Sequence, residues 1–121
     1  MRHEYTCVFC AILHGQAPAH VVAEERDSLV IVPLNPVTKG HVIVIPVHHV
    51  ERADTDPWTT GATFRDAANY TFNSGVGDHN LIVNSGPDAT QTIRHLHVHI
   101  VPRRPGDGLT LPWTGQHKET P

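Results

Sequence analysis

The chain has 121 residues, a formal net charge of −3 with histidine neutral, eleven histidines and two cysteines. This length fits one domain, and the slightly negative charge provides no basic field for nucleic acid. No apolar run is long enough to span a membrane, and residues 1–5 carry no signal-peptide core, so we expect a cytoplasmic protein with reduced cysteines. We expect a single domain over residues 1–121, with an ordered core over about residues 7–113 and a flexible tail over residues 114–121.

Cys7 and Cys10 form a CxxC pair at the start of a short predicted helix that Gly15 ends. In the cytosol such a pair is half of a zinc site, a redox pair or two small buried residues. Zinc requires two further ligands, and this histidine-rich chain can supply them. The pattern favours zinc and leaves the other two interpretations open.

Three strands are predicted in the first half of the chain, over residues 20–25, 28–33 and 41–46. Apolar residues fill the second strand continuously, which predicts burial on both of its faces. Pro46 ends the third strand, and His48 and His49 follow directly. His41 begins that strand after a glycine turn, where site residues are often found.

The main helix is predicted within residues 51–72, with Asp56 as its cap and Pro57 at its first position. A stripe at helical spacing predicts the face that packs on the core. Its members are Phe64, Ala67, Ala68 and Phe72. A glycine-rich turn at residues 75–78 then leads to a fourth predicted strand over residues 79–84.

Residues 95–100 alternate histidine with apolar side chains, the histidines being His95, His97 and His99. A strand has a side-chain period of two, so a strand here would place all three imidazoles on one face. Taken alone, the pattern suits a solvated strand face, three metal ligands, or nucleophilic catalysis by one imidazole. The surrounding motifs favour the third interpretation.

Those motifs occur in a fixed order along the chain. The order is the CxxC pair, Gly40-His41 followed by Val44-Ile45-Pro46, Asn84-x-Gly86, Gln91-Thr92 and the three histidines. This order closely resembles the histidine triad (HIT) family of nucleotide hydrolases and transferases, from Cys7 to about Trp113. The CxxC pair and the stretch from Gly106-Asp107-Gly108-Leu109 to Pro112-Trp113 resemble the bacterial branch. The resemblance implies an α+β fold, with an antiparallel sheet of about five strands, one long and one short helix, and a homodimer.

The resemblance also implies the chemistry. His97 would attack the α-phosphorus of a nucleoside phosphoramidate or dinucleoside polyphosphate and form a covalent nucleotidyl-histidine, with His99 and His41 beside the phosphate. A neutral imidazole suits this role near pH 7, provided that an acceptor holds the proton on its other nitrogen. No divalent ion would be needed at the phosphate. The implied phosphate-binding residues are Asn84, Gln91 and Thr92, and the implied wall of the base pocket is Phe9, Ile12, Ile31 and Leu34.

In the bacterial branch a structural zinc ion joins the CxxC pair to two histidines. The matching set in this chain is Cys7, Cys10, His49 and His95, with His48 as the rival to His49. Two thiolates and two imidazoles make a closed tetrahedral site.

One departure from the family concerns the sugar. Pro33 stands where the family usually has an Asp or Asn that binds the ribose hydroxyls, and a proline side chain offers no such bond. Asn35 lies close by in the sequence. Pro33 therefore supports an alternative function, a nucleotide-binding module with little turnover.

A second alternative is a hydrolase that uses His95, His97 and His99 as ligands of a catalytic metal. Against it, the chain has no obvious cluster of Asp or Glu residues to act as base.

Overall fold

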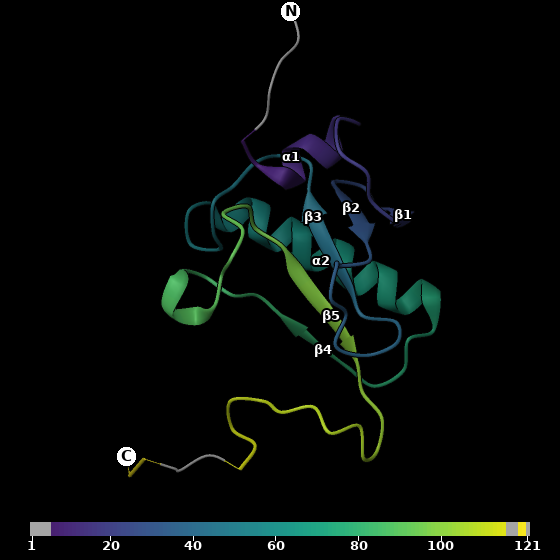
Figure 1. Cartoon of the computed structure of the whole chain (residues 1–121), viewed down its shortest axis with the longest axis vertical. Coiled ribbons are helices and arrows are strands. Elements are labelled where there is room, and N and C mark those ends of the chain that lie inside the picture. Colours follow the sequence, from purple (N-terminus) through teal and green to yellow (C-terminus); the bar gives the residue numbers. More distant parts are fainter. Residues whose placement is uncertain (1–5, 116–118, 121) are drawn as a thin grey trace, which may run out of the picture.

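The computed structural model describes residues 6–115 and 119–120 and forms a five-stranded sheet with two α-helices (Figure 1). In chain order the elements are α1 (Val8–Leu13), β1 (Val21–Glu24), β2 (Ser28–Ile31), β3 (Val42–Pro46), α2 (Pro57–Ser74), β4 (His79–Ile82), a 3-10 turn (Pro87–Ala89) and β5 (Val98–Pro102). The strands lie in the order β1-β2-β3-β5-β4, and all neighbours are antiparallel. The predicted α+β fold is confirmed. The predicted flexible tail lies partly outside the described residues.

Alternation along the central strands divides the core into two layers, one under each helix. One layer joins Ala67 of α2 to valines and an isoleucine of the sheet, namely Val30, Val42, Val44, Val98 and Ile100. The other joins Phe9 of α1 to Ile31, Ile43 and Ile45. The two helices therefore cover opposite faces, and Figure 1 shows α2 lying behind the strands. Within the described residues, no helix is both long and apolar enough to cross a membrane.

Helix α2 starts and ends at its predicted signals. The Asp56 side chain accepts hydrogen bonds from the N–H groups of Trp58 and Thr59, and Pro57 opens the first turn. At the other end Gly75 has a φ of 61°, a left-handed conformation that favours glycine.

The predicted core stripe of α2 is only partly correct. Ala67 is buried, and Phe64 packs against the same layer, but Ala68 is exposed and Phe72 is 86% exposed. The face of α2 that packs on the sheet is rotated from the predicted stripe and includes Asp66, a charged residue that a search for apolar periodicity does not consider. Its buried carboxylate accepts hydrogen bonds from the backbone N–H of Asp27 and the hydroxyl of Ser28, which fastens α2 to the start of β2.

Strand β5 begins at Val98, so only His99 of the three histidines lies in the strand. The β3–β5 ladder ends at the pair Val44–Val98. Pro46 has no N–H to extend the ladder, and the N–H of Leu96 instead donates to the carbonyl of Val50. The predicted strand is therefore shorter than expected and carries only His99. The three imidazoles still form one row, since Phe9 contacts the rings of His95 and His97 and the ring of His97 contacts that of His99.

Candidate functional site

His97 lies immediately before β5, with its ring packed edge-on against Phe9. Its Nδ1 is 2.8 Å from the carbonyl oxygen of His95. A carbonyl can only accept, so Nδ1 carries the proton and Nε2 keeps a free lone pair. His97 is 8% exposed, and its Nε2 has no hydrogen-bond partner among the described residues. Every side-chain nitrogen or oxygen that is fully buried in these residues does have a partner. That nitrogen is therefore not fully buried.

Burial lowers the pKa of His97 below its ordinary value of 6.5. The bond from Nδ1 to the His95 carbonyl acts in the opposite direction and is the smaller influence. His97 is therefore neutral near pH 7. A neutral ring with its proton held on one nitrogen and a lone pair on the other is what nucleophilic catalysis needs.

His41 and His99 face each other beside His97. His41 Nε2 is 3.0 Å from His99 Nδ1, and the ring centroids of His97 and His99 are 5.0 Å apart. The backbone N–H of Val37 donates to His41 Nδ1 at 3.0 Å. Burial lowers the pKa of His41, and burial together with the neighbouring His97 and His41 lowers the pKa of His99 to about 4. Both rings are therefore neutral near pH 7.

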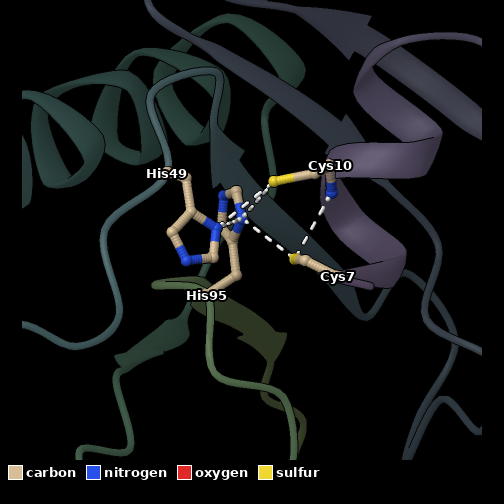
Figure 2. Close-up of side chains that lie close together, drawn as sticks. All are labelled: Cys7, Cys10, His49 and His95. Carbon is tan, nitrogen blue, oxygen red and sulfur yellow. Dashed lines mark hydrogen bonds between the residues drawn. The ribbon is translucent and has the colours of Figure 1, made fainter. Parts of the chain in front are cut away.

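The third histidine of the motif belongs to a different cluster. In Figure 2 the side chains of His49 and His95 face the two thiols, Cys7 at the cap of α1 and Cys10 within it. One ligand atom from each of the four residues lies within 4.8 Å of all the others. The sequence-derived set is thus brought together, with His49 rather than His48.

Two of the donor-atom distances match those of a tetrahedral zinc site, and the two that join His49 Nδ1 to His95 Nδ1 and to Cys10 Sγ are slightly shorter. Zinc bonds of ordinary length place neighbouring ligand atoms about 3.3–3.8 Å apart. His95 Nδ1 lies 3.4 Å from Cys7 Sγ, 3.6 Å from Cys10 Sγ and 3.0 Å from His49 Nδ1. His95 Nε2–H donates to the carbonyl of Pro46 at 2.9 Å, which leaves Nδ1 unprotonated and aimed at the thiols. A ring held in this way is arranged as a metal ligand.

The protonation of these residues is linked to ion binding. Burial raises the pKa of the Cys10 thiol to about 11, and burial also lowers the pKa of His95 to about 4. The imidazole is thus ready to bind a cation, whereas the Cys10 thiol has to lose its proton first.

Comparison with known proteins agrees with this arrangement. A family model described as the HIT domain matches residues 14–106, well over half of the chain. The chain belongs to the HIT family.

Several HIT relatives align over most of this chain. An uncharacterised HIT-like protein of Methanocaldococcus jannaschii is 38% identical over 84% of this chain and 82% of its own length. Adenosine 5'-monophosphoramidase hnt1 of Schizosaccharomyces pombe is 30% identical over 89% of this chain and 83% of its own. Adenylylsulfatase HINT3 of Arabidopsis thaliana is 34% identical over 85% of this chain and 55% of its own.

One solved HIT structure carries a metal. It is a zinc-bound histidine triad family protein from Mycobacterium smegmatis, with a TM-score of 0.78 and 36% identity over 87% of this chain and 80% of its own. The metal-ligand geometry described above thus occurs in a chain whose relative binds zinc.

The residues that the HIT resemblance assigned to phosphate are not equally available. Both functions of the Gln91 amide are used: its oxygen accepts from the N–H of Gly86, and its nitrogen donates to the carbonyls of Glu51 and Ile93. Gln91 therefore fixes the loop before the histidines. The side chains of Asn84, which is half-buried, and Thr92, which is exposed, make no hydrogen bond within the described part of the chain.

The residues assigned to the base pocket are divided as well. Phe9 and Ile31 lie in one buried cluster, and Ile12 packs against it. Leu34 is 98% exposed and is not brought to that cluster. Phe9 contacts the rings of both His95 and His97, so the wall that the resemblance implied lies directly against His97.

Two groups that orient histidines of this site could not be predicted from the sequence. The N–H of Val37 donates to His41, and the carbonyl of Pro46 accepts from His95. Both are backbone groups, which every residue or nearly every residue has. Their roles follow from where the loop after β2 and the end of β3 lie in space. Similarly, each of the three triad rings has its own partner, so the rings do not converge as ligands of one catalytic ion.

Proposed function

We propose that this HIT protein cleaves the bond between the α-phosphorus of a nucleotide and a small leaving group, with His97 as the nucleophile. The carrying observation is the His97 ring, whose Nδ1–H is held by the His95 carbonyl while Nε2 keeps its lone pair. The relatives named as a monophosphoramidase and an adenylylsulfatase support the substrate class. Both names describe an adenosine 5'-phosphoryl group joined to a small leaving group.

The proposed reaction has two displacements at phosphorus. His97 Nε2 forms a bond to phosphorus, and the bond to the leaving group breaks with its electron pair going to the leaving atom, which takes a proton from solvent. Nδ1–H stays on the His95 carbonyl and supports the positive charge that the ring acquires. Water then attacks phosphorus, the N–P bond returns its electron pair to His97, and the water releases one proton. The products are the nucleoside monophosphate and the protonated leaving group.

We propose in addition that Cys7, Cys10, His49 and His95 hold a structural zinc ion. Four protein ligands close the coordination shell, so such an ion supplies folding free energy and has no open position for substrate. The reaction above uses residues outside this set.

The deciding experiment compares His97→Ala with the wild-type protein on adenosine 5'-phosphoramidate. We expect turnover to fall by more than about 10³-fold, because the nucleophile is lost. Mass spectrometry of a rapidly quenched wild-type reaction should find an adenylyl group on the peptide that contains His97. The matched control is His20→Ala, since the His20 side chain is exposed and makes no hydrogen bond or ring contact with the site among the described residues.

Turnover by His97→Ala at the wild-type rate would end the proposal. Tight binding of adenosine 5'-monophosphate by the wild-type protein, with no turnover of any phosphoramidate, would instead select the binding-module alternative.

A further inference from the structure

The side-chain amide of Gln91 is the point where three separate segments of the site meet. Its oxygen accepts from the N–H of Gly86 at 2.8 Å, and its nitrogen donates to the carbonyls of Glu51 and Ile93 at 2.7 and 3.0 Å. A primary amide has two N–H donors and one carbonyl oxygen, so all three groups are engaged. Gln91 therefore joins the three segments and has no donor left for a ligand.

The two donors of Gln91 bind the segments that carry both histidines of the proposed zinc site. Glu51 lies two residues after His49, and Ile93 lies two residues before His95. The backbones of these two segments also share one direct hydrogen bond of 2.6 Å, beside the amide. How firmly the two histidines are held therefore affects the position of the Gln91 nitrogen.

The oxygen of Gln91 holds the loop that follows β4. Gly86 lies two residues after Asn84, which the HIT resemblance places at the phosphate. The Gly86 carbonyl accepts from the N–H groups of Ala89 and Gln91, each at 3.1 Å, which closes this loop. Gly86 has a φ of 92°, and a Cβ there would lie 2.8 Å from Nη1 of Arg52. The N–H of Gly86 is thus presented to Gln91 in a defined direction.

The hydrogen bonds of Gln91 lie at the surface, so they depend on the segments that they join. Gly86 is buried, whereas Gln91 is half-buried and Glu51 is exposed. Water competes for an exposed carbonyl, so the bond from the Gln91 nitrogen to Glu51 persists only while the two backbones keep their places. Four ligands on one ion would keep the segments of His49 and His95 together, and loss of that ion would let them separate.

We propose that Gln91 is a positioning residue that couples the four-ligand cluster to the loop of Asn84, so that a metal ion at the cluster strengthens nucleotide binding. This inference rests on the proposed function, for the nucleotide and for the zinc ion alike. An occupied cluster fixes the two carbonyls that receive the Gln91 nitrogen, and the Gln91 oxygen in turn fixes the loop. Such coupling is reciprocal, so the nucleotide strengthens metal binding by the same factor.

The coupling is measured with zinc and adenosine 5'-monophosphate as the two ligands. Calorimetry gives the nucleotide dissociation constant of zinc-loaded and zinc-free wild-type protein. Competition with a chelator of known affinity gives the zinc dissociation constant with and without saturating nucleotide. We expect each ligand to tighten the binding of the other by at least about fivefold.

Gln91→Met removes the link, because methionine is similar in length and lacks both the amide donors and the strong acceptor. In this variant both ratios should fall to within about twofold of one. A side chain that only supported the fold would weaken nucleotide binding equally with and without zinc and leave the ratio unchanged. Asp88→Asn is the matched control, since Asp88 is exposed in the same loop and its carboxylate makes no hydrogen bond among the described residues.

Hydrogen exchange tests the link directly in the zinc-loaded protein. The N–H of Gly86 donates to the Gln91 side chain, so Gln91→Met should speed its exchange by at least about tenfold. The N–H of Val32, which donates to the His20 carbonyl at the other edge of the sheet, should exchange equally in both proteins. Equal exchange of Gly86 in the two proteins would overturn the inference.

A wild-type ratio of one, or a wild-type ratio that persists in Gln91→Met, would also overturn it. A chain that unfolds as a whole without zinc gives the second result, since folding then couples the two ligands whether or not Gln91 is present. A failure of the proposed function is distinguishable because the wild-type protein itself then binds no nucleotide or no zinc, which overturns both proposals.

Discussion

Two pairs of histidines in this protein face each other at the same distance and have different chemistry. His49 and His95 bring their Nδ1 atoms to 3.0 Å, and His41 and His99 bring Nε2 and Nδ1 to 3.0 Å. The first pair lies among two thiols, whereas a backbone amide lies behind the second.

The difference comes from the far side of each ring. His95 donates its Nε2–H to the Pro46 carbonyl, so the nitrogen that faces His49 is bare and suited to a cation. His41 accepts from Val37 on its far nitrogen, so the nitrogen that faces His99 is protonated. A distance between two imidazoles therefore becomes informative only when the partner behind each ring is known.

The largest expected effect comes from removing one histidine of the pair His49 and His95, which belongs to the proposed zinc site. In His49→Ala we expect loss of bound zinc and a fall in unfolding temperature of at least about 10 °C, because a structural ion contributes several kcal/mol of folding free energy. Elemental analysis and scanning calorimetry of purified protein measure the two quantities.

His48→Ala is the matched control for that experiment. His48 is the adjacent exposed histidine and lies outside the group of four ligands, so its variant should keep both zinc and stability. Equal zinc content in the two variants, or a wild-type protein that binds no zinc, would contradict the assignment of the ligands.

A smaller effect on folding stability is expected when the pH is lowered, through the pair formed by His41 and His99. The pKa of His99 is about 4 in the folded protein and 6.5 ordinarily, so between these values the unfolded chain binds more protons. Stability should therefore fall as the pH decreases from about 6.5 toward about 4, with at most about 3 kcal/mol from this residue. Denaturant unfolding across that range should show a weaker pH dependence in His99→Gln than in the wild type.

His20→Gln, at an exposed histidine, should keep the wild-type slope in the same buffers and at the same zinc occupancy. An unchanged slope in His99→Gln would mean that this ring keeps its ordinary pKa in the folded protein.

The smallest effects on stability are expected from two arginines, each of which lies beside one of the two histidine pairs. Arg104→Ala removes two bonds to the loop before His41 and should cost about 1 kcal/mol or less. Arg94→Ala, beside the metal cluster, removes only an ion pair with Glu51 that is 78% and 48% exposed, and should change stability by no more than about 0.5 kcal/mol. Thermal unfolding of both variants ranks them. The reverse order would mean that the loop before His41 is not held by Arg104.

Much of the fold could be predicted from local chemistry. Asp56 and Pro57 mark the start of α2 because capping depends on neighbouring residues alone, and Pro46 ends β3 for a similarly local reason. Burial of Asp66 and exposure of Phe72 could not be predicted, because both depend on how α2 is rotated against β2.

The same limit applies to the site. The order of the motifs, through its resemblance to the HIT family, indicated the four clustered residues that we propose as zinc ligands and the histidine that we propose as nucleophile. The protons of His41, His95 and His97 are assigned by backbone atoms that any residue would present, so they appear only in three dimensions. Leu34 shows the converse case, an apolar residue at a pocket position that the fold leaves in solvent.

Pro46 has a consequence for protein engineering. Pro46 has no N–H, so the hydrogen-bonded ladder between β3 and β5 stops before it. Its carbonyl then accepts a hydrogen bond from His95 Nε2–H, so the same proline both releases this imidazole from the sheet and orients it. Anyone grafting this four-ligand arrangement onto another antiparallel scaffold would have to transplant the strand-ending proline together with the cysteines and histidines. With an ordinary residue in its place, the hydrogen-bonded pairing of the recipient strands would continue past the point where the imidazole has to leave the sheet.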